Sequence, residues 1–136
     1  MSHSAQQAII VVDTLRRALG DGIAVYQFGS SVAGATRRGS DLDVAVLASR
    51  RLGATERFDL QERVAASLGR DVDLVDLQSA STVMAMQVVS TGKVLFDGVP
   101  VTRGAFEDRT FSYYARLNEE RRGILERIAA EGTVYG

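Results

Sequence analysis

The stretch FGSSVAGATRRGSDLDVAV, residues 28–46, joins two apolar segments through a small turn and a polar loop. Gly29 and Ser30 follow the apolar run that ends at Phe28, and Asp41 and Asp43 open the next run. Residues two apart on a strand point to the same face of a sheet, so these two carboxylates are expected side by side. Carboxylates that close raise each other's pKa unless a cation lies between them. The pattern therefore predicts a magnesium site, because Mg2+ prefers oxygen ligands and bridges to phosphate oxygens.

The glycine turn before the loop predicts a phosphate site. Gly29 allows the backbone to turn tightly and to approach a ligand closely. Ser30 adds a hydroxyl group, and a helical turn after it would aim backbone N–H groups at an anion. Arg37 and Arg38 lie in the loop, where they would either neutralise triphosphate charge or be solvated. One segment thus offers a phosphate cradle and metal ligands, which is the equipment for phosphoryl or nucleotidyl transfer.

A third carboxylate comes from residues 71–77, where acidic and apolar residues alternate and predict another strand. On that strand Asp71 and Asp73 share one face and Asp76 lies on the other. If the strand pairs beside residues 42–47, Asp73 can point toward the first two carboxylates. The pattern does not choose between Asp71 and Asp73 as the third metal ligand or general base. Asp76 is expected at the surface or behind the site.

Hydrophobic periodicity and turn residues predict four helices and four strands. The helices are expected over residues 5–19, from the cap Thr55 to residue 68, from the cap Ser79 to residue 91, and over residues 100–131. The strands are expected over residues 23–28, 42–47, 71–77 and 93–96. These elements predict a small mixed β-sheet with flanking helices, an α/β or α+β fold. Residues 1–136 are assigned to one domain, with a core at 1–98 and a helical segment at 99–136.

Composition narrows the possible chemistry. The formal net charge is -1, so no global basic field draws the chain to nucleic acid. With no cysteine and one histidine, His3, zinc sites, cysteine nucleophiles and Ser-His-Asp triads each lack a required part. Carboxylates, hydroxyls, arginines and backbone groups are left to perform any catalysis. The apolar runs are too short to cross a bilayer and the start lacks signal-peptide features, so we expect a cytoplasmic protein.

The spacing of the motif resembles a known family. Gly29-Ser30, ten residues, then Asp41-Leu42-Asp43 is similar to the G-S-x10-D-x-D signature of the DNA polymerase beta-like nucleotidyltransferase superfamily. The segment GRDVDLVDL, residues 69–77, resembles the strand that carries the superfamily's third carboxylate, with Asp73 at the matching position. The small size resembles the minimal nucleotidyltransferases. The ending, YYARLNEERRGILERIAAEGTVYG, is similar to the tail of MntA-type antitoxins.

This resemblance implies a site and an activity. Gly29 and Ser30 would hold the triphosphate of ATP. Asp41 and Asp43 would bind magnesium, and Asp73 would complete the metal-binding triad and help to activate the acceptor. The implied protein is the antitoxin of a type VII toxin–antitoxin pair, which transfers AMP from ATP to a tyrosine of a HEPN-type RNase toxin and silences it.

Two other functions stay open. One is an antitoxin that acts by binding alone and has a relic active site. The other is a nucleotidyltransferase for a small molecule. The predicted elements use almost every residue on the core that holds the nucleotide, which favours an acceptor that brings its own surface, namely another protein.

The final predicted helix carries apolar and aromatic side chains among charged ones. An apolar stripe is expected from four residues: Leu117, Ile124, Leu125 and Ile128. Phe111, Tyr113 and Tyr114 are close neighbours on this helix, so they cannot all face the same core. An aromatic side chain left exposed there would anchor a partner, and packing against the domain is the alternative.

Overall fold

The computed structural model describes residues 2–29 and 41–135, with side chains as far as Glu131. The four helices are α1 (His3–Leu19), α2 (Ala54–Leu68), α3 (Thr82–Thr91) and α4 (Pro100–Tyr135). The four strands are β1 (Ala24–Phe28), β2 (Leu42–Leu47), β3 (Val72–Asp76) and β4 (Lys93–Asp97). The predicted mixed sheet with flanking helices is confirmed, and so is the order of its elements.

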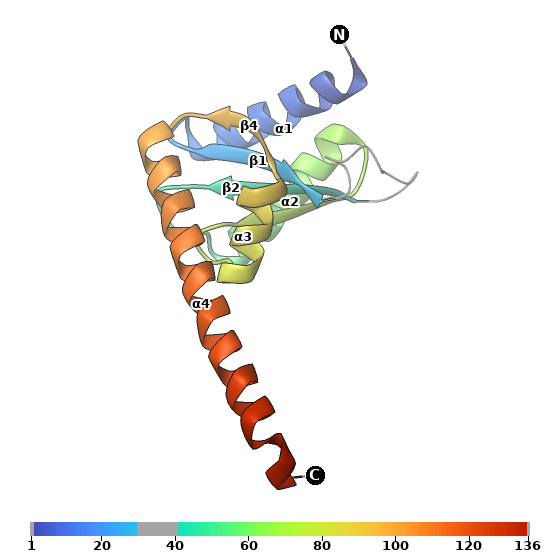
Figure 1. The fold of residues 1–136 in the computed structure, drawn as a ribbon. Coiled ribbons are helices and arrows are strands. Elements are labelled where there is room, and N and C mark those ends of the chain that lie inside the picture. The colour runs from blue at the N-terminus through green and yellow to red at the C-terminus, as the bar shows by residue number, and fades with distance from the viewer. Residues whose placement is uncertain (1, 30–40, 136) are drawn as a thin grey trace.

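The strands form one sheet in the order β3-β2-β1-β4 (Figure 1). β1 pairs antiparallel with β2 and with β4, whereas β2 pairs parallel with β3. α2 makes the crossover that joins the parallel pair, because parallel neighbours cannot be joined by a tight turn. The third strand therefore lies beside residues 42–47, as the sequence prediction for Asp73 required.

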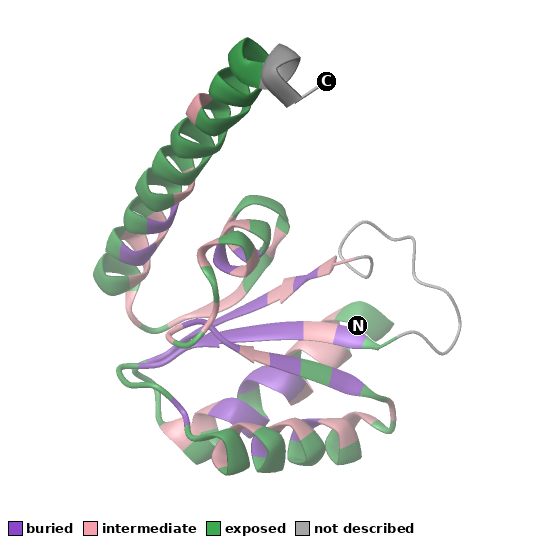
Figure 2. Ribbon diagram, turned by 90° about the horizontal axis from the view of Figure 1, so that it is seen from below, coloured by how far each residue is buried: buried purple, intermediate pink, exposed green. Residues whose placement is uncertain are grey.

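Helices cover both faces of the sheet (Figures 1 and 2). α1 and α2 pack on one face, over a core that includes Val44 and Leu74. α3 and the first part of α4 pack on the other face, over Tyr26 and Ala45. Successive residues of a strand point to opposite faces, so the nearly continuous apolar run of β2 is buried on both sides.

The first turns of α4 are tied to the sheet by a polar network. Arg103 pairs with Asp97 at the end of β4 at 2.8 Å and with Glu107 one turn along the helix at 2.7 Å. The buried Tyr26 hydroxyl donates to the same Glu107 carboxylate at 2.6 Å. Burial and the Glu107 carboxylate both raise the pKa of Tyr26, so its hydroxyl stays protonated and remains a donor at neutral pH.

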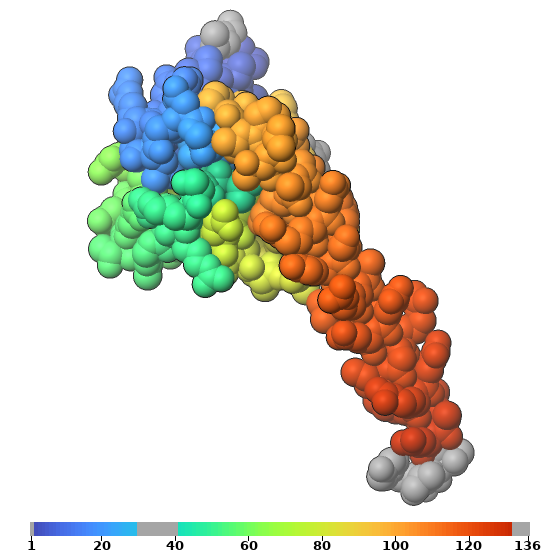
Figure 3. All heavy atoms as spheres, turned by 90° about the vertical axis from the view of Figure 1, so that its left-hand side faces the viewer, coloured from blue at the N-terminus to red at the C-terminus, as the bar shows by residue number. Residues whose placement is uncertain are grey.

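The rest of α4 leaves the body of the molecule (Figures 2 and 3). Phe106 and Thr110 are buried, whereas no side chain from residue 111 to 131 is buried. Phe111 and Tyr113 are exposed, as expected for at least one of the three aromatic neighbours. No helix in the described part of the chain is both long and apolar enough to cross a membrane.

The starts of two helices differ from the prediction. α2 begins after Gly53, which offers no side-chain cap, so the predicted Thr55 cap is wrong and Thr55 lies in the first turn. α3 begins after Ser81, whose Oγ accepts from the Met84 N–H at 3.1 Å. The Ser79 cap is therefore also wrong, because an additional turn separates β3 from the helix. Ser79 instead donates its hydroxyl to Asp76 at 2.8 Å.

Candidate active site

Three neighbouring strands bring predicted site residues into one row. The antiparallel register sets Phe28 opposite Asp43, and the parallel register sets Asp43 opposite Asp73. Residues paired in register point to the same face of a sheet, so both carboxylates lie on the face that carries α3 and α4. Gly29 follows Phe28 directly, which places the glycine turn at the same end of the sheet. Asp41 lies two residues before Asp43, just before β2 begins.

Gly29 lies against the carboxylate of Asp43. Its φ is +80°, in the region that favours glycine. A Cβ atom at this position would lie 3.1 Å from the Asp43 Cγ and closer still to a carboxylate oxygen. Conformation and space therefore both require glycine here, because the Asp43 side chain occupies the place that a Cβ would need.

The charges of the row act on one another. Asp43 is half-buried, and Asp41 and Asp73 are exposed. Burial raises the pKa of Asp43, and the carboxylates of Asp73 and then Asp41 raise it further. Asp71 is not among the charges that shift this pKa, which favours Asp73 as the third carboxylate of the site.

The donor set fits a divalent cation. Carboxylate oxygens from two adjacent strands are the ligands that Mg2+ prefers, and a cation would relieve the repulsion that raises the pKa of Asp43. Within residues 2–29 and 41–135, no three acidic or histidine side chains converge tightly enough to form a ready-made metal cluster. An ion would therefore have to draw these carboxylates together.

Four residues that the sequence analysis placed at or near the site lie outside the described residues: Ser30, Arg37, Arg38 and Ser40. The proposed contacts of Ser30 with the triphosphate, and the alternatives for the two arginines, stay predictions.

Asp76 has a different role from the one expected. It is 4% exposed, so a surface position is wrong. Its carboxylate accepts from the Leu52 N–H at 2.9 Å and from the Gln78 N–H at 3.1 Å, in addition to the Ser79 hydroxyl. The sequence carried a signal for this burial, because Asp76 shares its strand face with the apolar Val72 and Leu74. Asp76 joins the segments that follow β2 and β3. It lies at the end of the sheet opposite Asp41, Asp43 and Asp73, which we call the carboxylate row.

Known proteins share both the sequence and the fold of this chain. Residues 16–98 match the family described as polymerase beta, nucleotidyltransferase. The chain is 43% identical over 106 residues to the protein adenylyltransferase MntA of Shewanella oneidensis, an alignment that spans 78% of this chain and 76% of that relative.

Two solved structures extend the similarity over nearly the whole fold. A crystal structure of a toxin–antitoxin with AMP-PNP contains a chain that is 38% identical, with a TM-score of 0.80, covering 90% of this chain and 98% of the other. A structure of the tri-AMPylated Shewanella oneidensis HEPN toxin in complex with MNT antitoxin contains a chain that is 35% identical. Its TM-score is 0.75, and the match covers 91% of this chain and 97% of the other.

Proposed function

The chain belongs to the polymerase beta nucleotidyltransferase family, and from that premise we propose that it is an MntA-type antitoxin. It transfers AMP from ATP to a tyrosine of a HEPN-type RNase toxin and thereby silences the toxin. The 43% identical relative is named a protein adenylyltransferase, and a similar chain occurs in a complex with a tri-AMPylated HEPN toxin. A similar chain was also solved in a toxin–antitoxin with AMP-PNP, an ATP analogue, which supports ATP as the donor.

The observation that carries this proposal is the row formed by Gly29, Asp43 and Asp73. Neighbouring strands lie about 4.8 Å apart, so the glycine turn, a half-buried carboxylate and an exposed carboxylate fall within the length of a triphosphate. Nucleotidyl transfer depends on positioning and on neutralising charge, and these groups supply the means for both.

We assign Asp41, Asp43 and Asp73 as the residues that would hold magnesium. Bound Mg2+ would neutralise the triphosphate and orient the pyrophosphate leaving group. Asp43 lies between the glycine turn and Asp73, and its pKa is raised, so a cation beside it would stabilise its charged form.

The chain's own residues position the reactants and move the proton. Gly29 lets the backbone approach the triphosphate, and the Ser30 hydroxyl donates to a phosphate oxygen. Asp73 accepts the proton of the tyrosine hydroxyl as its oxygen forms a bond to the α-phosphorus. The bond between that phosphorus and the oxygen bridging to the β-phosphate breaks, and pyrophosphate leaves.

The whole of residues 1–136 is assigned to one nucleotidyltransferase domain, in which the core at 1–98 carries the chemistry. The segment 99–136 is assigned to a C-terminal helical part, and within it the residues from 111 onward are assigned to the partner, since no side chain from 111 to 131 is buried in the described part of the chain. The reaction is placed in the cytoplasm, where ATP and the RNA targets of a toxin are available.

Transfer of label from ATP tests this function. A HEPN-type toxin from the same genome is incubated with the chain, Mg2+ and ATP labelled at either the α- or the γ-phosphate. Label should reach the toxin only from the α-phosphate, and the double variant Asp41→Ala, Asp43→Ala should not transfer it. The Asp71→Ala variant, which changes a nearby exposed carboxylate, is the matched control and should remain active. Label arriving from the γ-phosphate would indicate phosphoryl transfer and contradict the proposal.

A further inference from the structure

We propose that the projecting part of α4 and a notch at its root form one docking surface for the HEPN-type toxin, separate from the carboxylate row. The identity of the partner rests on the proposed function. The existence of the surface rests on the observations that follow.

The apolar face of α4 continues past the point where the helix leaves the body. Beyond the buried Phe106 and Thr110, residues at spacings of three, four and seven stay on the same side of the helix: Tyr114, Leu117, Ile124 and Ile128. The last three are 42%, 48% and 59% exposed. Figure 2 shows burial on α4 confined to the part beside the sheet. Apolar side chains that gather on one side of a helix are normally buried, so the exposure of this face indicates a surface that another protein covers.

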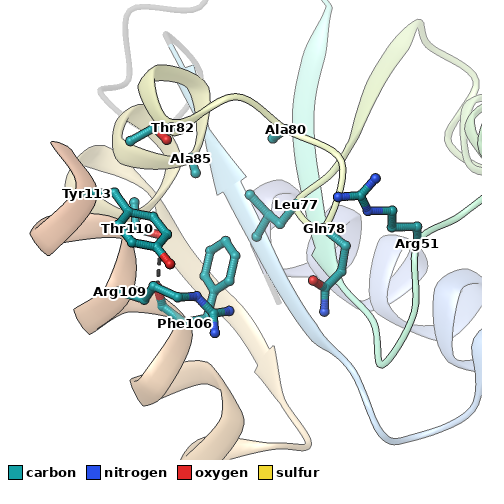
Figure 4. Close-up of a pocket in the computed structure, with 10 residues that line it drawn as sticks. All are labelled: Arg51, Leu77, Gln78, Ala80, Thr82, Ala85, Phe106, Arg109, Thr110 and Tyr113. Atoms are coloured by element: carbon teal, nitrogen blue, oxygen red, sulfur yellow. Dashed lines mark hydrogen bonds between the residues drawn. The ribbon is translucent and has the colours of Figure 1, made fainter. Parts of the chain in front are cut away.

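A notch of ≈ 270 Å³ lies where α4 leaves the body (Figure 4). Leu77, Ala85 and Phe106 give it apolar walls. Arg109 reaches it from α4, and Arg51 reaches it from the segment after β2 on the other side (Figure 4). The notch thus combines these apolar walls with a mostly polar lining that includes two guanidinium groups at its sides.

Asp76 holds the segments around this notch in place. Its hydrogen bonds to the Leu52 and Gln78 N–H groups fix the residue after Arg51 and a residue that lines the notch. The Gln78 side chain in turn donates to the Ala48 carbonyl at 2.8 Å. Because a buried carboxylate joins both segments, the notch is preorganised for a ligand, which lowers the entropic cost of binding.

The charge of the surface indicates the chemistry of the partner. Arg51 and Arg109 border the notch and Arg121 lies within the apolar face of α4, and none of the three forms an ion pair with a described carboxylate. The Arg109 guanidinium lies over the Phe106 ring at 5.9 Å, which leaves its N–H groups available. A partner with an apolar strip flanked by carboxylates would complement this surface.

Arg121 also argues against a second copy of this chain as the occupant. It lies between Leu117 and Ile124, in the middle of the apolar face. A symmetric antiparallel pair of helices centred on this face would set Arg121 against its own copy. Like charges at the centre of an apolar interface are unfavourable, whereas a different protein can supply a carboxylate there.

The position of the surface suits an enzyme whose substrate is a protein. The carboxylate row lies at the start of β2 and the notch lies past its end, both on the side of the sheet that carries α3 and α4. A strand rises about 3.3 Å per residue, so roughly 15–20 Å separates them along β2. A toxin held on α4 and in the notch would span this distance and present a tyrosine to the row at high effective concentration.

Paired variants on opposite sides of α4 test this surface. Leu117→Glu, Ile124→Glu places two carboxylates on the apolar face, and Ala115→Glu, Ala130→Glu places the same two on the opposite side of the same helix. The HEPN-type toxin is titrated against the full chain and each variant by calorimetry, and transfer of AMP is measured against toxin concentration. The first variant should bind the toxin about 100-fold more weakly, as expected for losing anchor side chains, and raise KM with kcat unchanged. The second should behave as the unchanged chain.

The outcomes separate this proposal from the proposed function. Equal toxin binding by both variants, with transfer intact, would overturn the docking surface and leave the function standing. Selective loss of binding by the first variant, with no AMP transfer by the unchanged chain, would support the surface and overturn the function. If the chain alone forms dimers that only the first variant dissociates, while toxin binding is unaffected, the occupant is a second copy and the proposal is wrong.

Discussion

At the scale of single residues, Asp43 is a carboxylate whose charged form is disfavoured by its surroundings. It lies between a glycine that leaves no room for a Cβ and a carboxylate on the next strand, and burial adds to the repulsion. A group that is unfavourable in its charged form without a ligand is poised to bind a cation. The site is therefore held together by the fold against its own electrostatics.

The Asp43→Asn variant tests whether the charge of Asp43 lowers the stability of the fold. The pKa of Asp43 is raised in the folded state, so folding favours the protonated form, and ionisation lowers stability as the pH rises above the ordinary aspartate range. The amide should therefore raise the unfolding temperature at neutral pH, and the gain should disappear below about pH 3, where aspartate is protonated in both states. Mg2+ should stabilise the unchanged chain but not the variant. Thermal unfolding with and without Mg2+ measures both effects. A variant less stable than the unchanged chain at neutral pH would contradict the account.

Gly29→Ala addresses the other side of the row. The added Cβ meets a carboxylate at a positive φ, so the turn must shift at a cost of about 1–2 kcal/mol and displace Asp43. AMP transfer should fall steeply while the fold persists. Gly53→Ala is the matched control, since its φ is -68° and nothing lies near the added Cβ. Comparable transfer rates for the two variants would show that the cradle is not used.

At the scale of elements, Asp76 joins the ends of β2 and β3. Asp76→Ala removes the acceptor of two backbone N–H groups and one hydroxyl, and leaves the Leu52 N–H buried without a partner. The free energy of unfolding should fall by about 2–3 kcal/mol, the cost of unsatisfied buried donors. Urea denaturation measures this loss, and Asp71→Ala, an exposed aspartate at the other end of β3, should cost little. Equal losses from both substitutions would mean that Asp76 is not a structural tie.

The elements also show where prediction from sequence succeeds. β2 was predicted with its observed ends because a run buried on both faces is apolar throughout, and β3 followed from its alternation. The caps at Thr55 and Ser79 were wrong because a cap depends on where the preceding turn ends, and several residues nearby would serve equally. The spacing of Asp41 and Asp43 predicts a pair on one strand face, whereas the position of Asp43 beside Gly29 depends on the antiparallel register of β1 and β2.

At the scale of the whole molecule, the chain divides into a packed body and a projecting helix (Figure 3). The notch between them was not predictable from sequence. Arg51, Leu77 and Arg109 belong to segments that are distant in the chain and meet only through the strand order and the path of α4. The residues of the carboxylate row are brought together by the pairing of neighbouring strands, whereas the residues of the docking surface are brought together by the topology of the whole chain.

A chain ending at Arg116 tests this division. None of the removed side chains that the structure describes, residues 117–131, is buried, so the unfolding temperature should stay within a few degrees of the full chain. Binding of Mg2+ and ATP should persist, and binding of the toxin should be lost. Thermal unfolding and calorimetry provide the measurements. A shortened chain that fails to fold would show that the projecting helix stabilises the body after all.

The central claim is that the carboxylate row transfers AMP to a protein partner, and intact mass spectrometry of that partner tests it most directly. The HEPN-type toxin is weighed after incubation with the chain, ATP and Mg2+, beside a sample with the Asp41→Ala, Asp43→Ala variant. We expect mass increments of the adenylyl group on the toxin with the unchanged chain and none with the variant. An unmodified toxin held in a stable complex would contradict the claim and indicate an antitoxin that acts by contact alone.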